Sequence, residues 1–348
     1  MWRRAAITIA TVAFVLWAVP SIALTVFAAC LVAIAVDAVA TPLASRARIP
    51  RIVALLAVVS AILAGMVATV LLAGPSLSSQ MGVLAERIPN ALDRVEQWAA
   101  SQSWLAPLVS AAPSPEALLE DASRGVVGQV TGLFTGTIAG LAGAMIVLIM
   151  GVYLAWTPGI YVRGLLAIVP PAHRGRCHEV LGAIALALRW WLVGRFSAMA
   201  LVAVLTALGL TVIGVGPVIV LALIAGVLTF VPYLGPILAL VPAVLVASTE
   251  DGRAIVSVVA LYGLIQFIEN NAATPLIQNR AVALPPAALI AAQLLMGVLF
   301  GLLGILLATP LAVALIVAVQ MLWVQDALDT DVQVLGANHK GARTREIG

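Results

Sequence analysis

Charge is the scarcest property of this sequence. Only 9% of its 348 residues are Asp, Glu, Lys or Arg, whereas a soluble domain carries roughly 25%. An ordinary soluble globular domain is therefore excluded. The chain also has only two cysteines, too few to indicate a disulfide framework. It has no basic patch with interleaved aromatic residues, so we expect no nucleic-acid partner.

Catalytic motifs are missing as well. The sequence has no Walker motif and no HExxH motif, and its apolar segments hold no Ser–His pair, Cys–His pair or paired aspartates. ATP hydrolysis and the common hydrolytic mechanisms need such groups. His173, Cys177 and His178 lie close together but lack a further pair of ligands, so we predict no metal site. We expect a protein that is not an enzyme and that holds no cofactor.

Long apolar runs are abundant. Hydrophobic residues make up 63% of the chain, and the mean hydropathy is +1.14. A membrane-spanning helix needs about 20 apolar residues, and continuous rather than alternating runs favour helices over a barrel. We predict an all-α polytopic membrane protein, embedded in a lipid bilayer, with about eight transmembrane segments. These segments are residues 5–19, 22–40, 52–73, 133–156, 192–213, 217–248, 254–274 and 286–323.

The distribution of charge predicts the topology. Arginine is in excess before residue 5, in residues 45–51 and in residues 157–195, whereas acidic residues prevail in residues 74–132. Because cytoplasmic loops carry excess Lys and Arg, we expect a multi-pass protein of the inner (plasma) membrane with a cytoplasmic N-terminus. The expected divisions are transmembrane helices 1–3 in residues 1–73, an extracytoplasmic amphipathic helical unit in 74–132, a fourth transmembrane helix in 133–156, a cytoplasmic Arg-bearing loop in 157–191, a transport core with broken helices in 192–324, and a polar cytoplasmic tail in 325–348.

One apolar segment carries a cluster of polar side chains. Residues 262–275 read YGLIQFIENNAATP, and residues three and four apart share a helix face. An ionisable group within a membrane helix usually faces a bundle interior or a wet cavity, so Glu269 is the first candidate for binding a substrate or an ion. Polar contacts that only hold helices together are the alternative. Tyr262, Gln266, Glu269, Asn270 and Thr274 form the predicted stripe, Asn271 completes the polar pocket, and Pro275 closes it.

Two apolar runs contain helix breakers near their middle. Proline removes an amide donor, and backbone groups freed within a membrane must be satisfied inside the protein or in a wet cavity. Broken or re-entrant helices therefore indicate transport sites, although kinks and close packing are the alternative. The sequence GVLTF at 226–230 is similar to GVLFG at 297–301. The similarity reflects either a diverged internal repeat or chance. The predicted gating residues are Pro232, Tyr233, Gly235, Pro236, Pro275, Gly301, Gly304 and Pro310.

Three of these stretches occur together in a known family. They are GVLTFVPYLGP at 226–236, QFIENNAATP at 266–275 and GLLGILLATP at 301–310. With them the chain resembles the autoinducer-2 exporter family, also called PerM-like permeases, over nearly its whole length. The resemblance implies an inner-membrane transporter of about eight spans that forms a homo-oligomer and exports small solutes. Some relatives are associated with the furanone signal autoinducer-2 and others with sodium–proton exchange. The chain departs from the family at Gly194-Arg195, where relatives often carry Gly-Gln.

We therefore expect a secondary transporter that exports a small solute resembling autoinducer-2, with protons or sodium coupled through Glu269. Three alternatives stay open. Glu269 could bind a neutral solute without a coupled ion, or the chain could be a sodium–proton antiporter. It could also be a non-transporting membrane scaffold that acts through residues 74–132. The scaffold hypothesis predicts that Glu269→Ala is tolerated.

Overall fold

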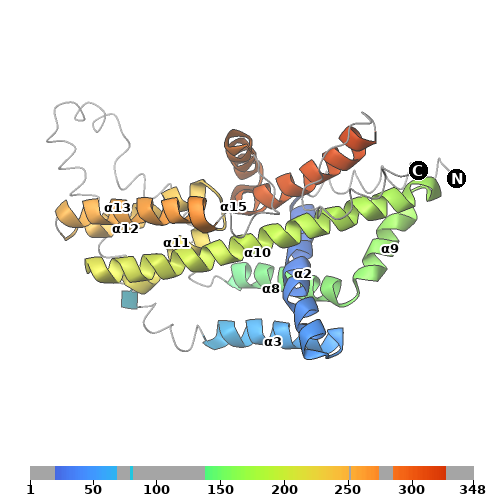
Figure 1. Cartoon of the computed structure of the whole chain (residues 1–348), viewed down its shortest axis with the longest axis horizontal. Helices are drawn as coiled ribbons and strands as arrows, with labels where there is room; N and C mark the ends of the chain where they lie inside the picture. The colour runs from blue at the N-terminus through green and yellow to red at the C-terminus, as the bar shows by residue number, and fades with distance from the viewer. Residues whose placement is uncertain (1–19, 69–78, 81–137, 251, 274–284, 327–348) are drawn as a thin grey trace. The chain divides into compact units, whose positions relative to one another are not determined.

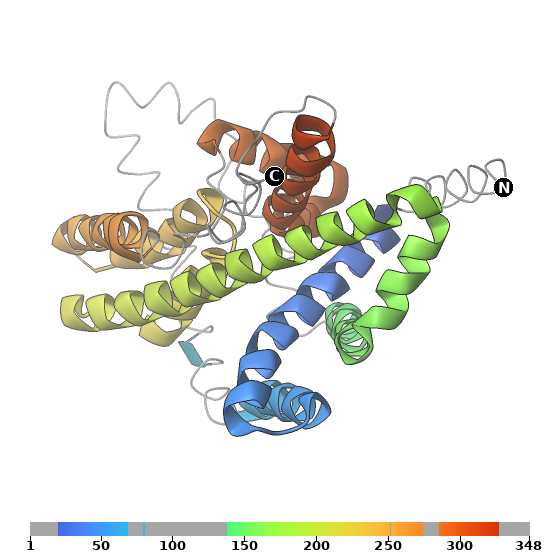
Figure 2. The same ribbon diagram turned by 45° about the vertical axis from the view of Figure 1, so that its right-hand side comes forward.

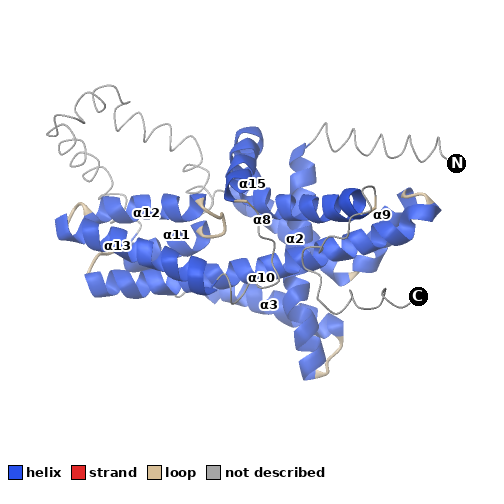
Figure 3. Cartoon of the chain, turned by 45° about the horizontal axis from the view of Figure 1, so that its top comes forward, coloured by secondary structure: helices blue, strands red, loops and turns tan. Residues whose placement is uncertain are grey.

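The computed structural model describes residues 20–68, 79–80, 138–250, 252–273 and 285–326. Every regular element within these ranges is helical, which confirms the all-α prediction for them (Figure 3). Among the described residues, four helices are long and apolar enough to cross a membrane, and a bent pair of helices is a fifth candidate. The predicted span at 5–19, Thr274, Pro275 and almost all of the 74–132 unit and of the C-terminal tail lie outside these ranges.

The helices belong to two compact units, which are described separately. Unit 1 comprises residues 1–63, 136–194 and 278–348, and unit 2 comprises residues 64–135 and 195–277. Helix α10 contributes its first half to unit 1 and its second half to unit 2 (Figure 1). The elements are α2 (Pro20–Ala47), α3 (Arg51–Ala68), α8 (Ile138–Trp156), α9 (Pro158–Ile168), η2 (Pro171–His173), α10 (Arg174–Ile213), α11 (Val218–Leu228), α12 (Leu234–Ala247), α13 (Gly252–Ile268), η3 (Glu269–Ala273), α15 (Pro286–Val319) and η4 (Gln320–Gln325).

Helices α2, α3 and α8 share an apolar core in unit 1. Gly151 lets α8 approach α2 closely, because a Cβ on Gly151 would lie 2.6 Å from Cγ1 of Val32. At the start of α3, Nη2 of Arg51 donates hydrogen bonds to Oδ1 of Asp37 at 2.6 Å and to the carbonyl oxygen of Ala155 at 3.0 Å. One guanidinium therefore joins the three helices.

The loop predicted at residues 157–191 is mostly helical. The chain bends by 86° between α8 and α9, where Pro158 occupies the start of α9, a position at which proline's missing amide costs nothing. Helix α10 then runs unbroken from Arg174 to Ile213, so the fifth helix begins well before residue 192, where its span was predicted to start. A run of charges indicates the side of a membrane and not the backbone conformation, so the proposed cytoplasmic segment can be helical. Residues 174–213 contain no proline that would end the helix.

Arg176 joins the start of α10 to the end of η4. Its guanidinium donates to both carboxylate oxygens of Asp326, at 2.9 and 2.8 Å, and to the carbonyl oxygen of Met321 at 2.9 Å. A further hydrogen bond reaches Oε2 of Glu179 at 3.0 Å. Bidentate arginine–carboxylate pairs are among the stronger polar contacts, so this cluster fixes the C-terminal end of the described chain within unit 1.

Helix α15 folds back on itself. Gly301 adopts φ 61° and ψ −143°, a conformation open mainly to glycine. Nε2 of Gln293 on the first arm reaches Oγ1 of Thr309 on the second at 3.4 Å, and a Cβ on Gly304 would overlap the carbonyl oxygen of Met296. By length and hydropathy alone α15 would cross a membrane, but it consists of two arms that meet at Gly301 and contact each other. We call residues 286–319 the second hairpin (Figure 2).

Unit 2 packs α11, α12 and α13 with the second half of α10 (Figure 1). Ala225 on α11, Ala239 and Ala243 on α12 and Val258 on α13 lie in one buried core. Helices α11 and α12 are each shorter than the roughly 20 residues of a spanning helix, and they pack against each other. Gly226 lets α11 approach α10. We call residues 218–247 the first hairpin.

Candidate functional site

The first hairpin reverses through residues 229–233. At Tyr233 φ is 63° and ψ is −53°, and the amide of Leu234 donates to the carbonyl oxygen of Pro232 at 2.7 Å. A hydrogen bond between residues two apart, with positive φ at the central residue, defines a rare and strained γ-turn. Strained backbone of this kind gathers at functional sites and persists only where the surroundings hold it.

Gly235 permits this sharp reversal. A Cβ on Gly235 would overlap the carbonyl oxygen of Leu228, because α12 returns directly over the end of α11. The break predicted at residues 231–236 is therefore a hairpin turn and not a kink in one long helix. The phenol ring of Tyr233 is partly exposed beside this turn.

The polar stripe lies where the winding of the chain changes. Helix α13 ends at Ile268, and residues 269–273 continue as the π-helix η3. Short π-helical segments are frequent at functional sites, and their wider turns shift the following residues away from α-helical spacing. Asn270 and Asn271 are exposed. Nδ2 of Asn271 donates to the carbonyl oxygen of Phe267 at 2.9 Å, so its predicted place in the pocket is wrong.

A buried ion pair joins α10 to the end of α13. Nη1 of Arg195 lies 3.4 Å from Oε1 of Glu269, and only 8% and 6% of the two side chains are exposed. Nε of Arg195 donates to the carbonyl oxygen of Phe230, in the turn of the first hairpin, at 3.1 Å. Nε2 of Gln266 donates to Oε2 of Glu269 at 3.1 Å. The guanidinium therefore bridges the unwound segment and the carboxylate.

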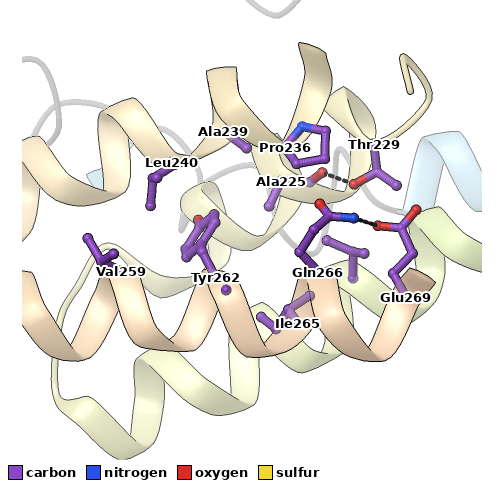
Figure 4. Close-up of a pocket in the computed structure, with 12 residues that line it drawn as sticks. Ala225, Thr229, Pro236, Ala239, Leu240, Val259, Tyr262, Ile265, Gln266 and Glu269 are labelled. Atoms are coloured by element: carbon purple, nitrogen blue, oxygen red, sulfur yellow. Dashed lines mark hydrogen bonds between the residues drawn. The ribbon is translucent and has the colours of Figure 1, made fainter. Parts of the chain in front are cut away.

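A cavity of about 250 Å³ lies beside the carboxylate, between residues of α10, α11, α12 and α13 (Figure 4). It is smaller than the roughly 300–1,000 Å³ of a typical ligand pocket, so it suits a small solute. Its wall is mostly apolar, with polar groups from Thr229, Tyr262, Gln266 and Glu269. The hydroxyl of Tyr262 is buried and has no hydrogen-bond partner among the described residues. Buried polar groups usually have one, so this hydroxyl is available to a ligand.

The structure brings part of the predicted site together. Tyr262, Gln266 and Glu269 from the stripe and Pro236 from the break line the same cavity. Figure 4 shows Gln266 and Glu269 side by side on their helix, with Pro236 across from them. Among the described residues, Asn270 meets this group only through Nε2 of Gln266, at 3.4 Å from its Oδ1. The α-helical spacing therefore predicted the face correctly as far as Glu269.

The remaining predicted gating residues belong to the second hairpin. Gly301 makes its turn, and Gly304 packs against the opposite arm. Pro310 is buried inside the second arm, which stays helical around it, so this proline does not break the helix. These residues lie in unit 1, whereas the cavity lies in unit 2.

Sequence reasoning missed the ion pair. Arg195 stood out only as a departure from a family pattern, and its partner lies 74 positions later in the chain. A signal was nevertheless present: Arg195 and Glu269 are the only charged residues inside the predicted spans 192–213, 217–248, 254–274 and 286–323. Charges within membrane helices usually pair with each other. Thr229, which lines the cavity, carried no comparable signal.

Among the described residues, the long apolar helices are those of a polytopic membrane protein. Residues 6–323 match the profile of the AI-2E family transporter, and the chain belongs to this family. Over 143 residues it is 31% identical to "Putative transport protein YrrI" of Bacillus subtilis (strain 168), a match that covers 41% of this chain and 40% of that relative. The expected family is confirmed.

Proposed function

We propose that the protein is a secondary transporter that exports a small polar solute, such as autoinducer-2, through the cavity of unit 2. The cavity itself carries the proposal, because it is small and mostly apolar and holds a few polar groups beside a broken helix. Pockets with this composition are typical of small-molecule sites, and broken membrane helices are typical of transport sites.

In this proposal three side chains bind the solute. Glu269 accepts hydrogen bonds from it, Gln266 offers an amide, and Tyr262 offers a buried hydroxyl that has no partner among the described residues. The opposite face of α13 carries the apolar side chains of Leu264 and Phe267, 56% and 64% exposed, which suits contact with lipid. One helix would thus separate the cavity from the bilayer.

The two hairpins are the proposed gates. The strained turn at Pro232, Tyr233 and Gly235 supports this role for the first hairpin, since stored strain favours a segment with two arrangements. Gly301 and Gly304 give the second hairpin a similarly tight reversal. Hinges of this kind are a few residues at the ends of elements that absorb large changes in φ and ψ.

We also propose about eight transmembrane segments and a homo-oligomer in the inner membrane. The arginine distribution supports a cytoplasmic N-terminus and a cytoplasmic segment at residues 157–191, with residues 74–132 outside. The count includes each hairpin as one segment made of two short arms. The division of the chain into a transport core at residues 192–324 and an outer unit remains part of this proposal.

Ion coupling through Glu269 has less support than export of a neutral solute. The carboxylate already has a counter-charge in Arg195, which argues against a sodium–proton antiporter built on this residue. Membership of a transporter family disfavours a non-transporting scaffold. Among the alternatives, binding of a neutral solute without a coupled ion fits the cavity best.

Solute flux from proteoliposomes tests this function. Vesicles loaded with autoinducer-2 would carry the wild-type protein, Glu269→Gln or the matched control Asn271→Ala, which changes an exposed polar residue outside the cavity. Since a hydrogen bond to a charged group contributes about 1.5–3 kcal/mol, we expect Glu269→Gln to lower flux by roughly tenfold or more. Asn271→Ala should match wild type. Equal flux from wild type and folded Glu269→Gln, or no flux from wild type, would contradict the proposal.

A further inference from the structure

Arg195 contacts the two kinds of oxygen that a coupling cation would use. Nε donates to the carbonyl oxygen of Phe230 at 3.1 Å, and Nη1 lies 3.4 Å from Oε1 of Glu269. In secondary transporters, unwound backbone carbonyls of broken helices coordinate sodium, and intramembrane carboxylates mark ion pathways. Both are present here, and one guanidinium binds both of them.

We propose that Arg195 is a built-in cation: its guanidinium takes the position that a coupling sodium ion would occupy between Phe230 and Glu269. A positive charge that is covalently part of α10 cannot leave with the solute. The site therefore binds no sodium, and transport through it is independent of a sodium gradient. The consequence for transport rests on the proposed function, whereas the consequence for cation binding does not.

Removing the charge should convert the position into a cation site. Arg195→Gln would leave the Glu269 carboxylate buried without this counter-charge, which is unfavourable in a low-dielectric interior. It would also remove the guanidinium from the carbonyl oxygen of Phe230. Carboxylate and carbonyl oxygens are the ligands that hard cations prefer. A bound sodium ion would therefore replace the positive charge that Arg195 no longer places beside Glu269.

Thermal unfolding of the purified full-length protein tests the inference without any solute. Each protein is heated in sodium chloride and in choline chloride at equal ionic strength. Wild type should unfold at the same temperature in both salts. An ion that binds only the native state stabilises that state. Arg195→Gln should therefore unfold at a temperature about 2–5 °C higher in sodium chloride than in choline chloride. The double variant Arg195→Gln/Glu269→Gln, which lacks the carboxylate, should show no difference between the salts.

Two results would overturn the inference. One is sodium-specific stabilisation of wild type, and the other is a folded Arg195→Gln protein that responds equally to both salts. If Arg195→Gln does not fold, Arg195→Met removes the charge at similar length and takes its place in the experiment. Sodium-specific stabilisation of wild type would still overturn the inference. A wild-type protein that transports no solute would contradict the proposed function and leave the sodium result intact.

Discussion

The two hairpins share a close contact between a glycine and a backbone carbonyl, but they differ in their polar contacts. In each, a glycine on the returning arm lies against a carbonyl oxygen of the first arm: Gly235 against Leu228, and Gly304 against Met296. The first hairpin turns through five residues with a strained Tyr233, whereas the second turns at Gly301 alone. This shared contact explains why the sequences of both hairpins combine glycine with an interrupted helix.

Their electrostatics separate the two hairpins. The first is held by Arg195, which is paired with the buried Glu269. The second is joined by a neutral hydrogen bond between Gln293 and Thr309. Charges inside a membrane are costly and are usually functional, while a neutral amide–hydroxyl contact is an ordinary link between helices. The comparison therefore supports the proposal that solute binds near the first hairpin.

The largest expected effect comes from the charge at the first hairpin. Glu269→Gln leaves Arg195 buried without its counter-charge, and removing one partner of a buried ion pair costs about 3–5 kcal/mol. Equilibrium unfolding in mixed detergent measures this loss in the free energy of unfolding. Asn271→Ala, which removes only an exposed amide, is the control and should change little. A Glu269→Gln protein as stable as wild type would mean that the pair contributes nothing to folding.

Next in size is the shared glycine contact. Gly235→Ala and Gly304→Ala each force a Cβ into a backbone carbonyl, and overpacking costs about 1–3 kcal/mol. The control is Gly143→Ala on α8, where a Cβ would meet no atom within 4 Å and stability should hold or rise. The same unfolding measurement applies. A loss at one hairpin only would break the structural likeness between them.

A smaller effect is expected at the neutral contact of the second hairpin. Gln293→Leu removes the hydrogen bond to Thr309 and should cost about 0.5–1.5 kcal/mol in stability. Equilibrium binding of labelled solute should be unchanged, because the cavity is lined by other helices. Loss of solute binding in a stable Gln293→Leu protein would show that the second hairpin also contributes to the site.

The smallest effect on stability is expected at Tyr262. Tyr262→Phe removes a buried hydroxyl that has no hydrogen-bond partner among the described residues, so the free energy of unfolding should stay the same or increase. A lost hydrogen bond to solute should raise the KM for export about 2–10-fold. The KM measured in proteoliposomes decides between these roles: an unchanged KM would remove Tyr262 from the site.

Local sequence patterns predicted the elements better than their contacts. The apolar runs predicted helices, of which four among the described residues are long and apolar enough to cross a membrane. VPYLGP predicted the first break, because backbone chemistry at proline and glycine is local. The spacing of Tyr262, Gln266 and Glu269 predicted one face correctly. It did not extend to Asn270, which follows Gln266 by four residues but is exposed and does not line the cavity. Residues 269–273 wind as a π-helix, which no i, i+4 pattern indicates.

Long-range contacts were beyond local patterns. The pairing of Arg195 with Glu269 and the reversal of α15 at Gly301 both depend on residues that are distant in sequence or on a single backbone conformation. In the predicted loop at residues 157–191, the charges masked a helix. Counting isolated charges within apolar runs, and pairing those of opposite sign, is the rule that would have found the ion pair.

The most direct test asks whether the charges of Arg195 and Glu269 are needed for export apart from their contribution to folding. In Arg195→Met/Glu269→Met the pair is replaced by apolar side chains of similar length, a change that is often neutral or stabilising. After unfolding measurements show that the variant is folded, its solute flux in proteoliposomes is compared with that of wild type. We predict a stable protein with export at background level. Export at the wild-type rate would contradict a role of the pair in solute binding and make it a structural link.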